Sequence, residues 1–369
     1  MSYGTSKGFG SEAVLVQKAL PKRGEPPFID RRTNALSNRR RRLPWPEERP
    51  FRILSLDGGG IRGIYTATLL AEIERNLISG RSVADYFDMI AGTSTGGIIG
   101  IGLSLKKSAK SIQDLYLENG KKIFPPFWMN YPILRWGKQL FCSLLDHRQL
   151  EKILYQTFKN QTIGEAQTRL IIPAFLGPKS QIAVLKTDHH PDFEHDHKMM
   201  AWEAARATSA APTFFSGHVG DGYVFLDGGV WANNPIMVAI VDAISAYEIS
   251  LSQIEILSIG TGNPPYEMGK FADRGGFFSW REIIKGAIFL TTDNAYSQAC
   301  LLIGPDQILR LEPTGPDAQI DLADWPSSAK RLPTIAKDHF RHHAQSLSAF
   351  FKNTVPPRER FYTIDTRKV

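Results

Sequence analysis

Short apolar segments alternate with longer segments that are apolar on one face along most of this chain. The first short segment, residues 51–56, reads FRILSL, which is the length and character of a buried strand. A glycine-rich turn follows, and residues 62–78 then carry leucine and isoleucine at helical spacing. This order predicts a strand, a tight turn and an amphipathic helix.

The same alternation continues toward the C-terminus without an internal repeat. Further strands are expected at residues 86–92, 169–176, 182–187, 223–227 and 254–260, and helices at 96–105, 112–123, 149–158, 201–208, 235–247 and 282–302. Strands separated by helices of this length are typical of an α/β protein. The pattern predicts a three-layer fold with a mainly parallel central sheet covered by helices on both faces.

Residues 1–50 differ in composition from the rest of the chain. They contain six prolines, and their eleven Lys and Arg residues against five acidic residues account for +6 of the total net charge of +7. We expect a basic, extended or mobile arm, which either is attracted to anionic headgroups or nucleic acid or is a solvated tail. Residues 51–369 are expected to form one domain, with core motifs in 51–270 and a helical extension in 271–369.

The first residues lack the apolar core of a secretory signal, which predicts a cytoplasmic protein. Cys142 and Cys300 lie far apart and match no metal-site or redox spacing, which favours a reducing compartment. The uncharged stretch Met89–Leu105 is slightly short for a membrane span and contains hydroxyl residues. A buried turn and helix is therefore expected there.

Gly92-Thr93-Ser94-Thr95-Gly96 fits the pattern G-x-S-x-G between an expected strand and an expected helix. In that context a sharp turn presents a serine hydroxyl at the edge of the sheet, and Gly92 and Gly96 leave room for the turn. The alternative is an ordinary turn rich in glycine and serine. The flanking strand and helix favour Ser94 as a nucleophile.

A serine nucleophile requires donors for the oxyanion, and the turn after the first strand offers them. The consecutive residues Gly58, Gly59 and Gly60 expose backbone N–H groups, and Arg62 adds positive charge. The same residues satisfy G-x-G-x-x-G. A dinucleotide site is disfavoured because no acidic residue ends the next strand, and a P-loop is disfavoured because no Gly-Lys-Ser/Thr follows.

Asp227 ends another expected strand and precedes Gly228 and Gly229, which places it at the carboxyl edge of that strand. This position makes Asp227 a candidate base for Ser94. An ordinary turn aspartate is the alternative, and a serine triad with His218 also remains open.

Taken together and in this order, the motifs resemble those of the patatin-like phospholipases. The resemblance covers residues 51–270 and includes two supporting segments, residues 204–215 and 257–262. It implies a patatin-like fold in which Ser94 attacks an ester carbonyl, Asp227 accepts the serine proton and the Gly58–Gly60 amides hold the oxyanion. No metal or other cofactor is implied.

The resemblance also implies a substrate class, namely glycerophospholipids, and peripheral contact with a membrane surface. The layout is similar to that of bacterial patatin-like effectors that cyclic oligonucleotides activate in anti-phage defence. This similarity implies a cyclic di- or trinucleotide activator and a location at the inner membrane when active, with no nucleic acid polymer as partner. A homo-oligomer is left open. The competing hypotheses are a catalytically silent nucleotide- or membrane-binding sensor and a nonspecific soluble esterase.

Three further segments carry expectations. Residues 125–141 are aromatic and interrupted by proline, and form either a lid over the site or a packed connection. Residues 188–197 hold many potential metal ligands, but Pro191 breaks any helix, so an exposed polar loop is expected. His339, His342 and His343 are placed on the surface of an amphipathic C-terminal helix.

Overall fold

The computed structural model describes residues 40–125, 143, 145–177, 180–212, 214–220, 222–262 and 277–362, apart from the side chains of residues 277–289, 317 and 318. Cys142 and residues 126–141 of the segment proposed as a lid lie outside the described residues. Cys300 is described, and its thiol is free.

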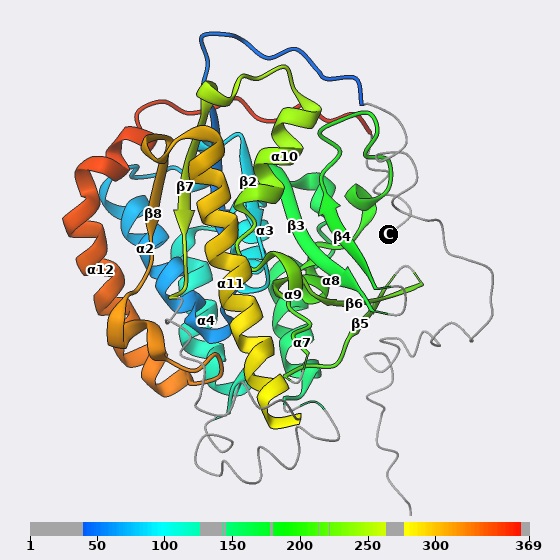
Figure 1. Cartoon of the computed structure of the whole chain (residues 1–369), viewed down its shortest axis with the longest axis vertical. Coiled ribbons are helices and arrows are strands. Elements are labelled where there is room, and N and C mark those ends of the chain that lie inside the picture. The colour runs from blue at the N-terminus through cyan, green and yellow to red at the C-terminus, as the bar shows by residue number, and fades with distance from the viewer. Residues whose placement is uncertain are drawn as a thin grey trace, which may run out of the picture.

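An eight-stranded sheet forms the centre of the described part of the chain (Figure 1). Its strands are β1 (Phe51–Leu56), β2 (Met89–Gly92), β3 (Arg169–Leu176), β4 (Gln181–Lys186), β5 (His218–Gly220), β6 (Tyr223–Asp227), β7 (Ile254–Ile259) and β8 (Ile308–Leu311). Their order is β5-β6-β3-β2-β1-β7-β8, and β4 pairs with β3. Strands β3, β2, β1, β7 and β8 are parallel, whereas β4, β5 and β6 join antiparallel. The expected mainly parallel sheet is confirmed.

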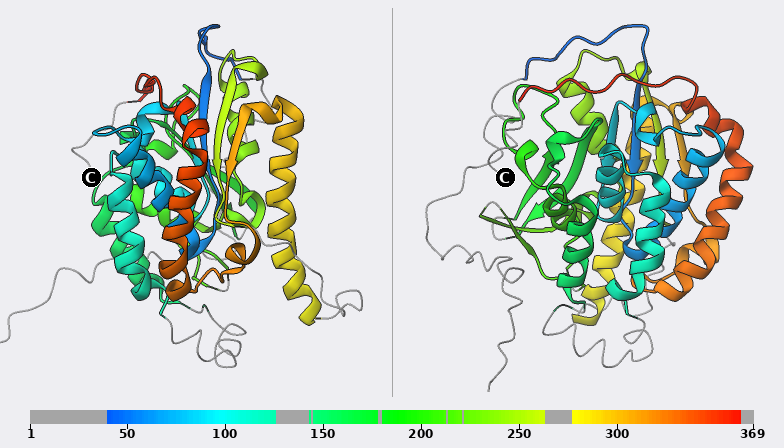
Figure 2. Two further views of the ribbon diagram at one scale, coloured as in Figure 1. Left: turned by 90° about the vertical axis from the view of Figure 1, so that its left-hand side faces the viewer. Right: turned by 180° about the vertical axis from the view of Figure 1, so that it is seen from behind.

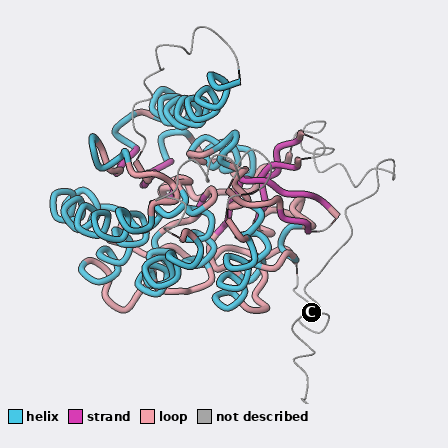
Figure 3. Tube along the Cα trace, turned by 90° about the horizontal axis from the view of Figure 1, so that it is seen from below, coloured by secondary structure: helices cyan, strands magenta, loops and turns pink. Residues whose placement is uncertain are grey.

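Helices cover both faces of this sheet. They are α2 (Gly63–Asn76), α3 (Thr95–Ser104), α4 (Ala109–Ile123), α7 (His147–Phe158), α8 (Ala201–Thr208), α9 (Gly229–Ala232), α10 (Ile236–Ala246), α11 (Phe277–Ile303) and α12 (Trp325–Phe350). Figure 2 shows α11 on one side of the sheet and α2, α4 and α12 on the other. Figure 3 shows the strands lying between these two helical layers.

The positions of the β1 side chains explain why its sequence is mostly apolar, with Arg52 and Ser55 as the polar exceptions. Phe51 and Ile53 pack into the cluster under α10 and α11, whereas Leu54 and Leu56 pack into the larger cluster under α2, α3 and α12. All four side chains are fully buried. A strand buried on both faces needs no alternation of polar and apolar residues, so a mostly apolar sequence is expected for β1.

The C-terminal part is more than the helical extension that the sequence predicts. β8 adds a parallel strand beside β7, with Ile308 opposite Ile256. The amphipathic helix is confirmed as α12, which buries Leu332 and Phe340 among other residues and packs against α2. His339 is not a simple surface residue, because its Nδ1 lies 2.7 Å from the hydroxyl of Tyr65.

The end of the predicted basic arm packs against the domain. The amide of Leu43 donates to the carbonyl of Ala246 (2.8 Å), and Trp45 is largely buried against Tyr247, with ring centroids 5.4 Å apart. Arg49 pairs with Asp88. The division of the chain at residue 50 stays a prediction. These contacts show that residues from 43 onward already pack against the domain.

The prediction of an exposed polar loop at residues 188–197 is wrong for four of its side chains. Asp188, His189, His190 and His197 are each almost fully buried. The reason is tertiary. Arg358 pairs with Asp188 at 2.7 Å and Tyr362 stacks on His197, whereas His189 contacts Asp242 and His190 contacts the carbonyl of Arg41. No cluster of three or more metal-ligating side chains occurs among the described residues.

Residues 89–105 form β2, a turn and α3, and the side chains of this stretch are buried. The expected buried turn and helix is confirmed. Within the described residues, no helix combines the length and the apolar character needed to cross a membrane.

Candidate active site

Ser94 occupies a strained turn between β2 and α3. Its φ of 54° and ψ of −119° are rare for a residue with a side chain, and strain of this kind is concentrated at functional sites. The turn depends on its glycines. A Cβ on Gly96 would lie 2.2 Å from the carbonyl oxygen of Leu56, and one on Gly92 would lie 2.3 Å from that of Gly96. Only glycine fits at these two positions of the motif.

The hydroxyl of Ser94 donates a hydrogen bond of 2.7 Å to Oδ2 of Asp227. The other carboxylate oxygen, Oδ1, accepts a 2.7 Å bond from the amide of Gly229. Both side chains are almost buried, with residue exposures of 8% for Ser94 and 5% for Asp227. The structure therefore brings together the two residues that the sequence singles out for catalysis.

Asp227 ends β6, as the sequence predicts, but β6 does not run parallel to the strand beside it. β6 is antiparallel to β3 and places Asp227 opposite Ala174. β2 is parallel to β3, occupies the neighbouring stretch of the same edge, and places Ala91 opposite Ile171. The carboxyl ends of β2 and β6 consequently approach each other head-on along one edge of β3.

Thr208, at the end of α8, ties the turn to the sheet. Its Oγ1 accepts from the amide of Ser94 (3.0 Å) and donates to the carbonyl of Pro173 (2.6 Å). Its own carbonyl accepts from the amide of Gly228 (3.4 Å). Sequence reasoning placed Thr208 in a supporting segment but gave it no role. A hydroxyl residue shortly before Ala-Ala-Pro carries too weak a local signal to predict this bridge.

We expect Thr208→Val to lower kcat about ten-fold or more and to lower the unfolding free energy by about 2 kcal/mol. Valine keeps the shape of threonine but leaves the buried amide of Ser94 and the carbonyl of Pro173 without this partner. Ester hydrolysis and chemical denaturation measure the two effects. Thr208→Ser, which keeps the hydroxyl, is the control and should stay close to the wild type. A fully active and stable valine variant would contradict the bridging role.

The glycine turn after β1 lies beside Ser94, because a Cβ on Gly58 would be 3.3 Å from Cβ of Ser94. The amide of Gly58 already donates to the carbonyl of Asn233 at 2.9 Å. The amides of Gly59 and Gly60 have no hydrogen-bond partner within the described ranges. The amide of Gly58 is therefore occupied in this conformation, and the role of Gly58, Gly59 and Gly60 as oxyanion donors stays a prediction.

Arg62 braces the glycine turn. Its Nη1 donates to the carbonyl of Gly262 (2.7 Å), and its Nε lies 3.5 Å from the carbonyl of Gly59. Burial lowers the pKa of Arg62 to about 10, so the side chain keeps its positive charge at neutral pH. The expected charge is present, and the carboxylates of Asp321, Glu312 and Asp57 favour it.

The surroundings of Asp227 favour a base that works near neutral pH. Burial raises the pKa of Asp227 from 3.8 to about 6, and the hydrogen bonds from Ser94 and Gly229 and the charge of Arg206 oppose this rise. A base is most effective when its pKa lies close to the operating pH. Asp227 is ionised above pH 6 and can then accept the proton of Ser94.

His218, the alternative base, lies on β5. Burial, with the positive charge of Arg206, lowers the pKa of His218 to about 3. Its Nε2 has no hydrogen-bond partner among the residues that the structure describes, and its ring packs edge-on against Trp202. The hydrogen bond of Ser94 goes to Asp227 instead, so the described contacts correspond to a two-residue arrangement.

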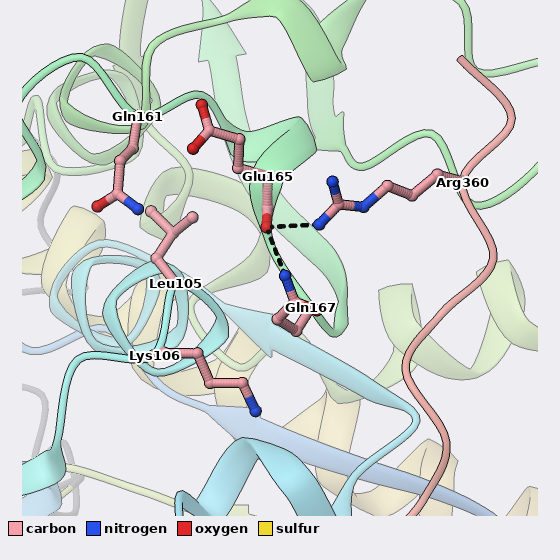
Figure 4. Close-up of a pocket in the computed structure, with 6 residues that line it drawn as sticks. All are labelled: Leu105, Lys106, Gln161, Glu165, Gln167 and Arg360. Carbon is pink, nitrogen blue, oxygen red and sulfur yellow. Dashed lines mark hydrogen bonds between the residues drawn. The ribbon is translucent and has the colours of Figure 1, made fainter. Parts of the chain in front are cut away.

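A separate hollow of about 350 Å³ lies at the end of α3 opposite to Ser94. Figure 4 shows its lining, in which Arg360 and Gln167 donate to the carbonyl of Glu165 at 3.0 Å and 3.2 Å. Leu105, Lys106 and Gln161 complete it. None of the predicted catalytic residues lines this hollow.

Comparison with known proteins agrees with the resemblance. A sequence model described as patatin-like phospholipase matches residues 54–240. A cGAMP-activated phospholipase of Vibrio cholerae is 37% identical over 245 residues, which are 61% of this chain and 69% of the relative. Another, of Pseudomonas aeruginosa, is 31% identical over 306 residues, 80% and 88% of the two chains. A third, of Escherichia coli, is 36% identical over 59% of this chain and 64% of its own length.

The match and the fold define the class of this protein as a lipid acyl hydrolase of α/β architecture. The chain belongs to the patatin-like phospholipase family. The predicted family, three-layer fold and enzyme class are confirmed.

Proposed function

We propose that this protein hydrolyses carboxylic esters of membrane glycerophospholipids, with Ser94 as nucleophile and Asp227 as base. The 2.7 Å hydrogen bond from the Ser94 hydroxyl to Asp227 is the observation that supports this proposal most directly. The strained backbone at Ser94 and the unpaired amides of Gly59 and Gly60 add to it. The intact pair argues against a catalytically silent sensor.

In the first half of the reaction, the Ser94 oxygen attacks the ester carbonyl carbon while its proton passes to Oδ2 of Asp227. The negative charge that develops on the carbonyl oxygen faces the amides of Gly59 and Gly60. The intermediate then collapses, the bond to the leaving alcohol breaks, and Asp227 returns its proton to that alcohol. An acyl group remains on Ser94, and a lysophospholipid is released.

In the second half, water replaces the alcohol and attacks the acyl carbon. Asp227 accepts a proton from the water, the bond to Ser94 breaks, and the proton returns to the serine oxygen. A fatty acid leaves, and the enzyme regains its starting state. All of these steps use side-chain and backbone groups of the chain, so the mechanism needs no metal ligand.

A cyclic dinucleotide is the proposed activator, and the phospholipid surface is the proposed peripheral partner. The support is sequence similarity to three relatives that are named cGAMP-activated phospholipases. Action at the cytoplasmic face of the inner membrane in anti-phage defence belongs to the same proposal. The identity to these relatives is 31–37% and extends over 59–80% of this chain. Activation by a cyclic dinucleotide is therefore proposed on sequence similarity alone.

We expect fatty acids to be released from phospholipid vesicles when cGAMP is added and to be nearly absent without it. Mass spectrometry of the lipid extract measures both fatty acid and lysophospholipid. Linear dinucleotides serve as the control for the ligand. Equal release without nucleotide would contradict regulation but leave the hydrolase, whereas nucleotide binding without any ester turnover would support the sensor. Equal turnover of short soluble esters and of vesicles would support a nonspecific esterase.

A further inference from the structure

Arg310, on the C-terminal strand β8, reaches the residue that begins the glycine turn. Its Nη2 lies 2.7 Å from Oδ2 of Asp57, and its Nη1 lies 3.3 Å from Oδ1. The exposed fractions of the two side chains are only 8% and 2%. This bidentate ion pair joins β8 to the turn that contains Gly59 and Gly60. β8 lies outside residues 54–240, which match the family model.

The guanidinium of Arg310 is itself held in place from two further directions. Its Nη1 donates to Oγ of Ser258 (2.7 Å), and its Nε and Nη2 donate to the carboxylate of Glu312 (3.3 Å and 3.1 Å). Gly260, the residue after β7, lies close to this cluster, because a Cβ there would be 2.5 Å from Oε2 of Glu312 and 2.8 Å from Nη2 of Arg310. A planar guanidinium can satisfy these partners at once, whereas the single ammonium of lysine cannot.

The remaining contacts of the turn fix its backbone on both sides of the two unpaired amides. The amide of Asp57 donates to the carbonyl of Ile259 (3.0 Å), and Oγ1 of Thr261 donates to the carbonyl of Gly58 (2.7 Å). Beyond the glycines, the amide of Ile61 donates to the carbonyl of Leu322 (3.0 Å). A run of glycines has little conformational preference of its own, so its geometry depends on such external contacts.

We propose that Arg310 is a positioning residue, which holds Asp57 so that the amides of Gly59 and Gly60 point at the developing oxyanion. The inference rests on the proposed function, because it assigns the oxyanion to these two amides. Arg310 acts through Asp57 and does not touch the reacting atoms. The C-terminal segment thereby supplies part of the catalytic geometry in addition to covering the sheet.

The test compares Arg310→Lys with Arg358→Lys in the full-length chain. Arg358 is a matched control, because it forms a similarly buried pair with Asp188 and its guanidinium otherwise donates to the carbonyls of Gly164, Ala166 and Glu359. Steady-state hydrolysis of a p-nitrophenyl ester and of cGAMP-treated phospholipid vesicles gives kcat and KM, and thermal unfolding gives stability.

We expect Arg310→Lys to lower kcat about 10- to 100-fold with a much smaller change in KM, since an oxyanion contact acts mainly on the transition state. Arg358→Lys should lower the melting temperature but leave kcat near the wild-type value. Equal loss of stability in the two variants with kcat unchanged in both would overturn the proposal. If Arg310→Lys does not fold, Asp57→Asn keeps the shape of the pair without its charge, and a wild-type kcat in that variant would also overturn it.

Failure of this inference is distinguishable from failure of the proposed function. If Ser94→Ala is inactive and Arg310→Lys is fully active, only the role of Arg310 is rejected. If Ser94→Ala keeps its activity, the proposed mechanism is rejected, and the inference falls with it.

Discussion

Ser94→Ala should lower fatty-acid release at least about 10⁴-fold while the protein stays folded, because removal of a nucleophile from a serine hydrolase abolishes the covalent route. The substitution deletes one oxygen atom and its 2.7 Å hydrogen bond to Asp227. Alanine tolerates the positive φ at this position no worse than serine. Release of radiolabelled fatty acid from activated vesicles measures the loss.

Circular dichroism and thermal unfolding provide the control for folding of the Ser94→Ala variant. A second chemical control is covalent labelling with a fluorophosphonate, which should modify the wild type at Ser94 and leave the variant unlabelled. Persistent release of fatty acid by the variant would show that another residue carries the reaction.

Asp227→Asn should lower kcat about 10³-fold or more at neutral pH, because the amide cannot accept the proton of Ser94. The wild type should lose activity as the pH falls through about 6, the raised pKa of Asp227, with the slope of a single protonation. The dependence of kcat/KM on pH between about 4.5 and 8.5 measures this loss of activity at low pH. A limb centred near pH 4 would indicate that burial does not control the ionisation of Asp227.

The same substitution should stabilise the protein at neutral pH. The pKa of Asp227 is raised on folding, so the folded state binds its proton more tightly than the unfolded state does. The tighter proton binding by Asp227 stabilises the folded state fully at pH values below the unfolded-state pKa. This stabilisation is lost as the pH rises through about 6. A difference of 3.8 to about 6 corresponds to at most about 3 kcal/mol.

An asparagine side chain in place of Asp227 would not carry this cost, and its oxygen can still accept from the amide of Gly229. We therefore expect Asp227→Asn to be more stable than the wild type at about pH 8 and equally stable at about pH 4. Denaturant titrations at the two pH values test the difference. Ser94→Ala is the comparison variant, because it removes the hydroxyl donor and leaves the carboxylate in place. Equal stability of Asp227→Asn and the wild type at the higher pH would argue against a raised pKa.

The local motifs account for much of the candidate site. Ser94 lies on a turn that requires Gly92 and Gly96, because a Cβ at either position would lie only 2.3 Å or 2.2 Å from a backbone oxygen. Such a requirement is visible as a glycine pattern in the sequence. The preceding strand β2 and the following helix α3 are equally visible as apolar segments of different length. The fold class could be predicted, and Ser94 and Asp227 could be singled out as the proposed nucleophile and base, because each carries a signal within a few residues.

Other features of the site involve partners that are distant in the chain. The amide of Gly58 is withdrawn from the donor set by the carbonyl of Asn233, and Thr208 bridges Ser94 and Pro173. Arg310 reaches Asp57 across 253 residues of sequence. The four buried side chains between residues 188 and 197 were expected to be exposed, because nothing near them in the sequence shows that Arg41, Asp242 and the C-terminal segment contact them.

By itself, the sequence determined the alternation of strands and helices, the turn at Ser94 and which side chains are the catalytic candidates. Periodicity and glycine requirements are properties of neighbouring residues, so they can be read along the chain. The tertiary structure decided that β6 runs antiparallel and meets β2 head-on, which amides stay unpaired, and which arginine holds the glycine turn. These features depend on contacts between segments far apart in the chain, and no local pattern specifies which of the possible partners such segments choose.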